Sequence, residues 1–180
     1  MERSDSHEGW SEATPSEGWS EATPSDRRQQ MTIPLDVFVA NEQSDVDIDE
    51  RRLVSLVRTA AGEEDVDPRA EISLLLVERH AMASLKEKWL GEPGPTDVLA
   101  FPMDDAATDD EPYVLGDIVV CPDVAREQST GGRVVEEVDL LVVHGFLHLL
   151  GYDHVRTQEA KSMRHRERKI LSEFYRKQGS

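Results

Sequence analysis

The chain has 180 residues, a net charge of −17 and a single cysteine. This length suits one domain with a substantial core, and one cysteine excludes an internal disulfide framework and a cysteine-based zinc site. No apolar run approaches a membrane span and the N-terminus is polar and acidic rather than a signal peptide, so we expect a cytoplasmic protein with no membrane partner. An acidic chain is also a poor general binder of nucleic acid, which requires basic surface.

A nine-residue segment is repeated in tandem near the N-terminus, over residues 8–16 and 17–25. Two short copies rich in Ser, Glu, Pro and Gly cannot build a solenoid, and their composition predicts disorder. We therefore expect residues 1–30 to form a disordered extension. A single folded domain is expected over residues 31–176, because the first apolar segment begins at Met31.

Apolar spacing and turn residues define the expected elements of this domain. In chain order they are a strand over 33–40, a helix over 49–61, a strand over 71–78, a helix over 81–90, a strand over 97–101, an acidic loop over 104–111, a strand over 113–120 and helices over 122–128, 134–150 and 157–175. Strands and helices interleave without a strict βαβ repeat. The predicted fold class is therefore α+β, with a small mixed β-sheet covered by helices.

The last part of the chain differs in charge from the rest. Residues 155–180 contain eight Lys and Arg residues against three acidic ones. The interpretation we favour is a solvated helix with its cations near the C-terminal end, where the helix dipole stabilises them. A contact with nucleic acid is the alternative, since this is the one segment with the appropriate sign of charge.

Three histidines within eleven residues carry the strongest functional signal: His144, His148 and His154. The first two are four residues apart, so on a helix they lie on one face, and Gly151 is the residue type best able to end that helix and turn the chain. Three nitrogen ligands and an open position are typical of catalytic zinc, and burying three imidazoles without a metal would leave ring nitrogens without partners. We therefore predict one Zn²⁺ per chain, on the central helix and the turn after it.

This spacing matches the metzincin metallopeptidase motif H-E-x-x-H-x-x-G-x-x-H at its three ligands and its glycine. The general-base glutamate of that motif is replaced here by Gly145. Because the base normally takes a proton from the zinc-bound water, a peptidase without it should be badly impaired. A metallopeptidase-like hydrolase is therefore the weaker hypothesis.

The motif HGFLHLLGYDH, together with GPTDVLAFP at residues 94–102 and LGDIV at residues 115–119, resembles the bacterial YbeY family over about residues 31–175. The resemblance implies a single-strand-specific, zinc-dependent endoribonuclease in which zinc-bound water attacks the RNA phosphodiester. It further implies maturation of the 3′ end of small-subunit ribosomal RNA, late ribosome quality control, and no action on DNA. The implied partners are the small ribosomal subunit, a ribosomal protein and an Era-like GTPase.

One position departs from the family pattern, which often has an arginine facing the substrate phosphate shortly before the Gly/Pro loop. Leu90 stands there in this chain, and Lys88 is the nearest cation. Lysine can contact phosphate as a point charge, so Lys88 is the candidate substrate-binding residue, with an exposed helix lysine as the alternative.

Other residues carry weaker signals. Asp153, Asp97 and Asp117 are candidates for orienting a histidine or the substrate, and no protein base is identified. His80 and His165 lack partners at metal-ligand spacing and are expected on the surface, and Cys121 is expected to be a small apolar residue beside a strand end.

Two further classes of function remain beside the ribonuclease. A non-catalytic assembly factor would use zinc only to hold its fold, and its histidine variants would lose stability but still rescue ribosome defects when overproduced. A metallopeptidase would have to hydrolyse peptides despite Gly145.

Overall fold

The computed structural model describes residues 35–103, 111–153 and 157–179. The tandem repeat, the predicted domain start at Met31, most of the acidic loop and His154 lie outside these ranges. The described elements are β1 (Asp36–Asn41), α1 (Glu50–Glu63), β2 (Ala70–Leu76), α2 (Arg79–Leu90), β3 (Val98–Pro102), β4 (Tyr113–Val120), α3 (Pro122–Gln128), a short 3₁₀ turn (Thr130–Gly132), α4 (Val134–Leu149) and α5 (Thr157–Gln178).

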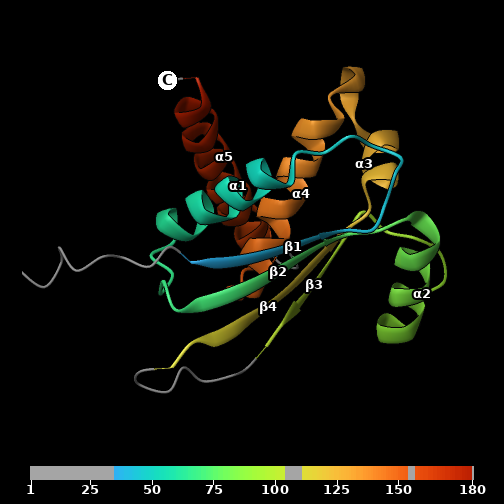
Figure 1. The fold of residues 1–180 in the computed structure, drawn as a ribbon, viewed down its shortest axis with the longest axis horizontal. Coiled ribbons are helices and arrows are strands. Elements are labelled where there is room, and N and C mark those ends of the chain that lie inside the picture. The colour runs from blue at the N-terminus through green and yellow to red at the C-terminus, as the bar shows by residue number, and fades with distance from the viewer. Residues whose placement is uncertain (1–34, 104–110, 154–156, 180) are drawn as a thin grey trace, which may run out of the picture. The chain divides into compact units, whose positions relative to one another are not determined.

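The strands form one mixed sheet in the order β1-β2-β4-β3. β1, β2 and β4 run parallel, whereas β3 pairs antiparallel with β4 and forms an edge of the sheet. The helices α1, α4 and α5 lie together on one side of this sheet, and α2 lies apart from them near one end of the strands (Figure 1). The predicted α+β class, a small mixed sheet covered by helices, is confirmed.

Side-chain alternation gives the sheet two different faces. One face, which includes the fully buried Leu74 and Ile118, packs against α1, α4 and α5 and forms the main core with Phe146. On the other face Leu99 and Val119 pack under Met82 of α2 in a second, smaller cluster. Each fully buried side chain of this size contributes about 1.5–3 kcal/mol to folding. The face that the three helices cover is therefore the main source of stability, and α4 lies within it.

Most element boundaries differ from those predicted by one to three residues, and two of the differences have a clear cause. The strand predicted over 71–78 ends at Leu76, because Glu78 is the N-cap of α2 and the chain enters that helix at Arg79. The helix predicted over 49–61 begins at Glu50, since the Asp49 carboxylate accepts hydrogen bonds from the first-turn backbone N–H groups and marks the helix start. Both differences arise from capping.

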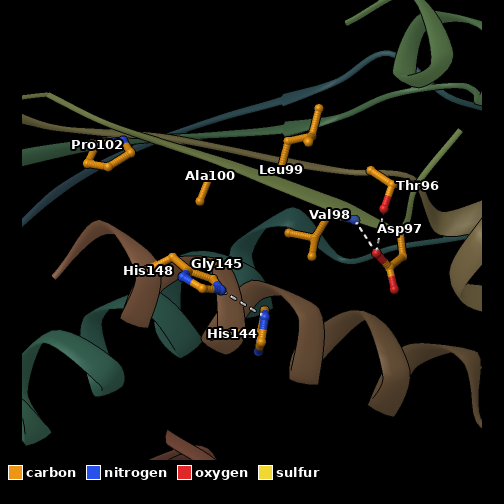
Figure 2. A pocket seen from close by; sticks show the side chains of 9 residues that line it. All are labelled: Thr96, Asp97, Val98, Leu99, Ala100, Pro102, His144, Gly145 and His148. Carbon is orange, nitrogen blue, oxygen red and sulfur yellow. Dashed lines mark hydrogen bonds between the residues drawn. The ribbon is translucent and has the colours of Figure 1, made fainter. Parts of the chain in front are cut away.

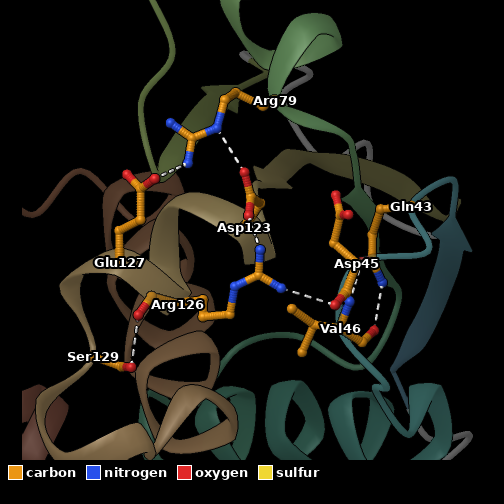
Figure 3. A network of polar contacts seen from close by, with 8 residues as sticks. All are labelled: Gln43, Asp45, Val46, Arg79, Asp123, Arg126, Glu127 and Ser129. Atoms are coloured by element: carbon orange, nitrogen blue, oxygen red, sulfur yellow. Dashed lines mark hydrogen bonds and ion pairs between the residues drawn. The ribbon is translucent and has the colours of Figure 1, made fainter.

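A polar network joins the start of α2 to α3 and to the loop before α1 (Figure 3). Arg79 Nε donates to Asp123 Oδ2 at 2.6 Å, Arg126 pairs with the same carboxylate, and Arg126 Nη1 donates to the Asp45 carbonyl at 3.1 Å. The hydrogen bond from Arg79 lowers the pKa of Asp123. Since Arg126 is exposed and Arg79 is only partly buried, the network orients these segments more than it stabilises them.

The basic C-terminal segment forms α5, with Arg176 and Lys177 in its last turn, as the favoured interpretation predicts. The helix is solvated on one face only, because its other face buries Met163, Ile170 and Phe174. Lys169 pairs with Glu63 of α1 at 2.9 Å. None of the described helices is both long and apolar enough to cross a bilayer.

Candidate metal centre

His144 and His148 lie one turn apart on α4 and are both half-buried. Their rings meet edge to face with centroids 4.7 Å apart, and the two Nε2 atoms are 3.1 Å apart. Two nitrogens bound at 2.0–2.1 Å to one tetrahedral zinc would be about 3.3 Å apart. The paired imidazoles therefore fit a shared metal ion with little rearrangement.

The turn after α4 has the geometry that the sequence predicts. Gly151 has φ +82°, and its N–H donates to the His148 carbonyl while the Tyr152 N–H donates to the Leu147 carbonyl, which is a Schellman motif. The Tyr152 hydroxyl then donates to Glu64 Oε2 at 2.8 Å, which fixes the turn against the end of α1. The turn that precedes the third predicted ligand in the sequence is thus held in place.

His154 lies outside the described residues, so its part in the metal site remains a prediction. Within the described ranges no group of three potential ligands converges. The structure therefore supplies two of the three predicted ligands and the turn that precedes the third.

A residue that the sequence did not single out completes the surroundings of His144. Glu167 of α5 is almost fully buried, and His144 Nδ1 donates to its Oε1 at 2.8 Å. That hydrogen bond leaves Nε2 of a neutral imidazole as the nitrogen with a lone pair toward a metal. One signal in the sequence could have indicated Glu167. It is an acidic residue that falls at helical spacing with Met163, Ile170 and Phe174, on the apolar face of a basic helix.

Replacing Glu167 by glutamine is expected to weaken metal binding about 10-fold, and alanine about 100-fold, because a carboxylate partner fixes the tautomer and the orientation of the ring. Chelator competition measures this affinity. Glu173→Gln on the same helix is the matched control, since the ion pairs of Glu173 described in the structure are with the exposed Arg176 and Lys177 of its own helix. Equal affinities for Glu167→Ala and wild type would contradict the role of Glu167.

A cavity of about 470 Å³ is lined by residues of α4 and by the segment that contains the edge strand β3. Figure 2 shows His144, Gly145 and His148 on the helix side, facing the segment that runs from Thr96 to Pro102. Its polar wall comes from the two histidines and from Thr96 and Asp97, and the rest is apolar. The candidate metal site thus opens into a space large enough for a substrate group.

Gly145 lies where α4 comes closest to the sheet. A Cβ atom there would be 2.7 Å from Ile118 Cγ2 and 3.3 Å from Val98 Cγ2. Ile118 is fully buried and cannot withdraw easily. A side chain at the position occupied by glutamate in metallopeptidases would therefore overlap Ile118 unless the packing between α4 and the sheet shifts.

Gly145→Ala is expected to destabilise the protein by about 1–2 kcal/mol, because the overpacking penalty exceeds the gain in helix propensity. Gly62→Ala on α1 is the control, since a methyl group added at Gly62 would have nothing within 4 Å. That variant should gain up to about 1 kcal/mol. Urea unfolding measures both, and a stabilising Gly145→Ala would show that the contact is not tight.

The other candidates are distributed as follows. Asp97 lines the cavity, where its Oδ1 accepts from the Val98 N–H at 2.8 Å and from Thr96 Oγ1 at 3.1 Å. Asp117 pairs with Phe101 in the β3–β4 ladder, and Asp153 follows the turn after α4. Of the three aspartates, only Asp97 shares the cavity with the histidines.

Lys88 lies on α2 and is not among the residues that line the cavity. Its Nζ lies 5.1 Å from the centroid of the Trp89 ring. Its contact with a substrate phosphate therefore remains a prediction. His80 and His165 are exposed, as expected, and Cys121 is buried at the end of β4, where burial raises the pKa of its thiol.

Comparison with known proteins gives a consistent result. The family described as endoribonuclease YbeY matches residues 38–175. The endoribonuclease YbeY of Acidothermus cellulolyticus is 48% identical over 138 residues, which cover 71% of this chain and 84% of that protein. Its counterpart from Beutenbergia cavernae is 47% identical over 143 residues, covering 76% and 95%.

A solved structure agrees in fold. The solution structure of a Thermotoga maritima protein superposes with a TM-score of 0.52 at 24% identity, covering 78% of this chain and 90% of that one. This likeness concerns the fold alone. The match over residues 38–175 and the identity to relatives along most of their length establish that the chain belongs to the YbeY family.

Proposed function

We propose that this protein is a zinc-dependent endoribonuclease that cleaves single-stranded ribosomal RNA at the cavity between α4 and β3. Membership of the YbeY family supports the endoribonuclease class. The observation that carries the proposal is the pair of Nε2 atoms of His144 and His148, 3.1 Å apart, on the wall of that cavity. His154 is the proposed third ligand.

The chain's own residues prepare the site in three ways. Glu167 fixes the ring of His144 so that its Nε2 faces the other imidazole. Gly145 allows α4 to approach the sheet, which sets the narrow spacing between the histidines and β3. When bound, the metal supplies a Lewis acid that lowers the pKa of water to about 7 and offsets charge on phosphoryl oxygens.

The site contains little to act as a protein base. Asp97 is the carboxylate among the described lining residues, and its Oδ1 is already held by Thr96 and Val98. Gly145 contributes no side chain at the position where peptidases have glutamate. Proton removal from water therefore depends mainly on the metal, which favours a slow or context-dependent nuclease over a peptidase.

The substrate we propose is the 3′ region of small-subunit ribosomal RNA in the cytoplasm, with the small subunit, a ribosomal protein and an Era-like GTPase as partners. A net charge of −17 supports this arrangement. Such a protein gains little affinity from long-range attraction to RNA and benefits from being positioned by other ribosome-bound proteins.

Metal removal tests the function. Purified protein is stripped with a chelator, reloaded with Zn²⁺ or another divalent ion, and given single-stranded RNA spanning the ribosomal 3′ end, single-stranded DNA of the same sequence, or an unstructured peptide. Cleavage of the RNA alone, lost on stripping and restored best by Zn²⁺, is the expected result. Equal RNA cleavage before and after stripping would refute it.

The same assay distinguishes the endoribonuclease from a non-catalytic, zinc-stabilised assembly factor. That protein would bind Zn²⁺ and unfold more easily without it, but the loaded form would not cut RNA. Peptide hydrolysis by the loaded form would revive the metallopeptidase hypothesis.

A further inference from the structure

β3 is an edge strand, so half of its backbone groups point away from the sheet. Two hydrogen bonds at the ends of the strand fix which half: the Cys121 N–H donates to the Asp97 carbonyl at 2.8 Å, and the Met103 N–H donates to the Leu115 carbonyl at 3.1 Å. With the antiparallel register, residues 97, 99, 101 and 103 bond to β4. Residues 98, 100 and 102 turn their backbone groups to the free edge.

The three outward residues do not offer equal donors. The Val98 N–H is taken by Asp97 Oδ1 at 2.8 Å, and Pro102 has no N–H. Among the described strand residues this leaves the Ala100 N–H as the donor at the edge. All three outward carbonyl groups remain as acceptors.

This donor lies at the candidate metal site. Ala100 lines the same cavity as His144 and His148, and Figure 2 places it on β3 facing that part of α4. We propose that the free edge of β3 binds the backbone of a single RNA strand, with the Ala100 N–H donating to a non-bridging phosphate oxygen next to the scissile linkage. The inference rests on the endoribonuclease function proposed above.

The pattern of donors and acceptors selects RNA over a peptide. A peptide added to a sheet edge requires alternating donors and acceptors along it, and this edge lacks donors at Val98 and Pro102. The negative charge of Asp97 also disfavours a phosphate beside Val98. A phosphate at Ala100, flanked by carbonyl groups that accept hydrogen bonds from ribose 2′-hydroxyls, matches what the edge offers.

Ala100→Pro tests the contact, because proline removes the N–H and is tolerated at an edge position whose N–H points outward. Ala100→Val is the control, since it adds comparable bulk and keeps the N–H. For zinc-loaded full-length protein, Ala100→Pro should lower kcat/KM on single-stranded RNA about 10- to 100-fold with unchanged zinc affinity. Ala100→Val adds bulk to the cavity and should lose some rate, but clearly less than Ala100→Pro, because its N–H remains.

Substrate chemistry locates the contact. Linkages beside the scissile bond are replaced one at a time by neutral methylphosphonates. At one linkage, the methylphosphonate should slow cleavage by wild type as much as the Ala100→Pro substitution slows cleavage of the unmodified RNA. The same methylphosphonate should slow the Ala100→Pro variant little further, because both changes remove the same hydrogen bond. Fully additive losses at every linkage would overturn the proposal.

A measurement on the unaltered protein covers the case in which the proline variant does not fold. Metal-free, ¹⁵N-labelled wild type is titrated with a short single-stranded RNA, and the amide proton of Ala100 should shift more than those of Leu99 and Phe101, which bond to β4. A larger chemical-shift change at Leu99 or Phe101 than at Ala100 would overturn the proposal. So would an Ala100 amide signal that shifts on addition of an extended peptide but not on addition of RNA.

The outcomes also distinguish a failure of the proposed RNA contact at Ala100 from a failure of the proposed endoribonuclease function. If wild type cleaves RNA and Ala100→Pro cleaves equally well, the edge contact is wrong and the endoribonuclease function stands. If Ala100→Val loses as much as Ala100→Pro, cavity volume is responsible and the contact is again wrong. A zinc-loaded wild type that does not cleave RNA refutes both.

Discussion

Replacing His144 by alanine is expected to lower RNA cleavage by on the order of 10³-fold, with a matching loss of zinc affinity. The variant removes one of the two Nε2 atoms that lie 3.1 Å apart and leaves the buried Glu167 carboxylate without the imidazole to which it is bonded. Cleavage of single-stranded RNA and chelator competition on the same preparations measure the two effects.

The matched control is His80→Ala, because the His80 side chain is 81% exposed and lies on α2, away from the cavity. That variant should cleave and bind zinc as wild type does. A contaminating nuclease would give equal cleavage in wild type and both variants, whatever their zinc content. Equal cleavage by wild type and His144→Ala would therefore refute the assignment of this site.

Local patterns allowed much of the fold to be predicted. The strand over 113–120 and the start of the helix at Pro122 were predicted to the residue, because proline cannot continue a central strand and suits the first position of a helix. The turn at Gly151 was predicted for the same kind of reason, since positive φ favours glycine. Such features depend on neighbours in the sequence.

The parts of the site that were missed depend on distant contacts. Glu167 lies 23 residues after His144, and only the packing of α5 against α4 brings its carboxylate to the ring. The outward N–H of Ala100 depends on the register of β3 against β4, which one sequence does not reveal. A charged residue at the apolar spacing of a helix, such as Glu167 in α5, thus indicates a buried partner even when the helix as a whole is rich in charged residues.

Gly145 shows how one residue changes the interpretation of a motif. Its spacing among the histidines suggested a metallopeptidase without its base. In the folded protein it allows close contact between α4 and the sheet, at Ile118 and Val98. In this chain the absence of glutamate at position 145 is therefore explained by packing as well as by a difference in chemistry.

Arg52→Met is expected to destabilise the protein by about 3–5 kcal/mol, because it leaves a buried charge without its partner. Asp139 of α4 is fully buried, and Arg52 of α1 binds both of its oxygens, with Nη2 2.6 Å from Oδ2. The Tyr175 hydroxyl of α5 donates to Oδ2 at 2.8 Å, and burial raises the pKa of that hydroxyl. Urea unfolding at neutral pH measures the loss.

Arg51→Met is the control, since Arg51 is the exposed neighbour on the same helix and should change stability by less than about 0.5 kcal/mol. The triple variant Arg52→Met, Asp139→Leu, Tyr175→Phe should recover most of the loss, because it removes every polar group of the network together. A loss below about 1 kcal/mol in Arg52→Met would show that the carboxylate is hydrated. Because Asp139 and His144 share α4 while Tyr175 and Glu167 share α5, the network also holds the helix of the predicted metal ligands against the helix whose Glu167 is hydrogen bonded to His144.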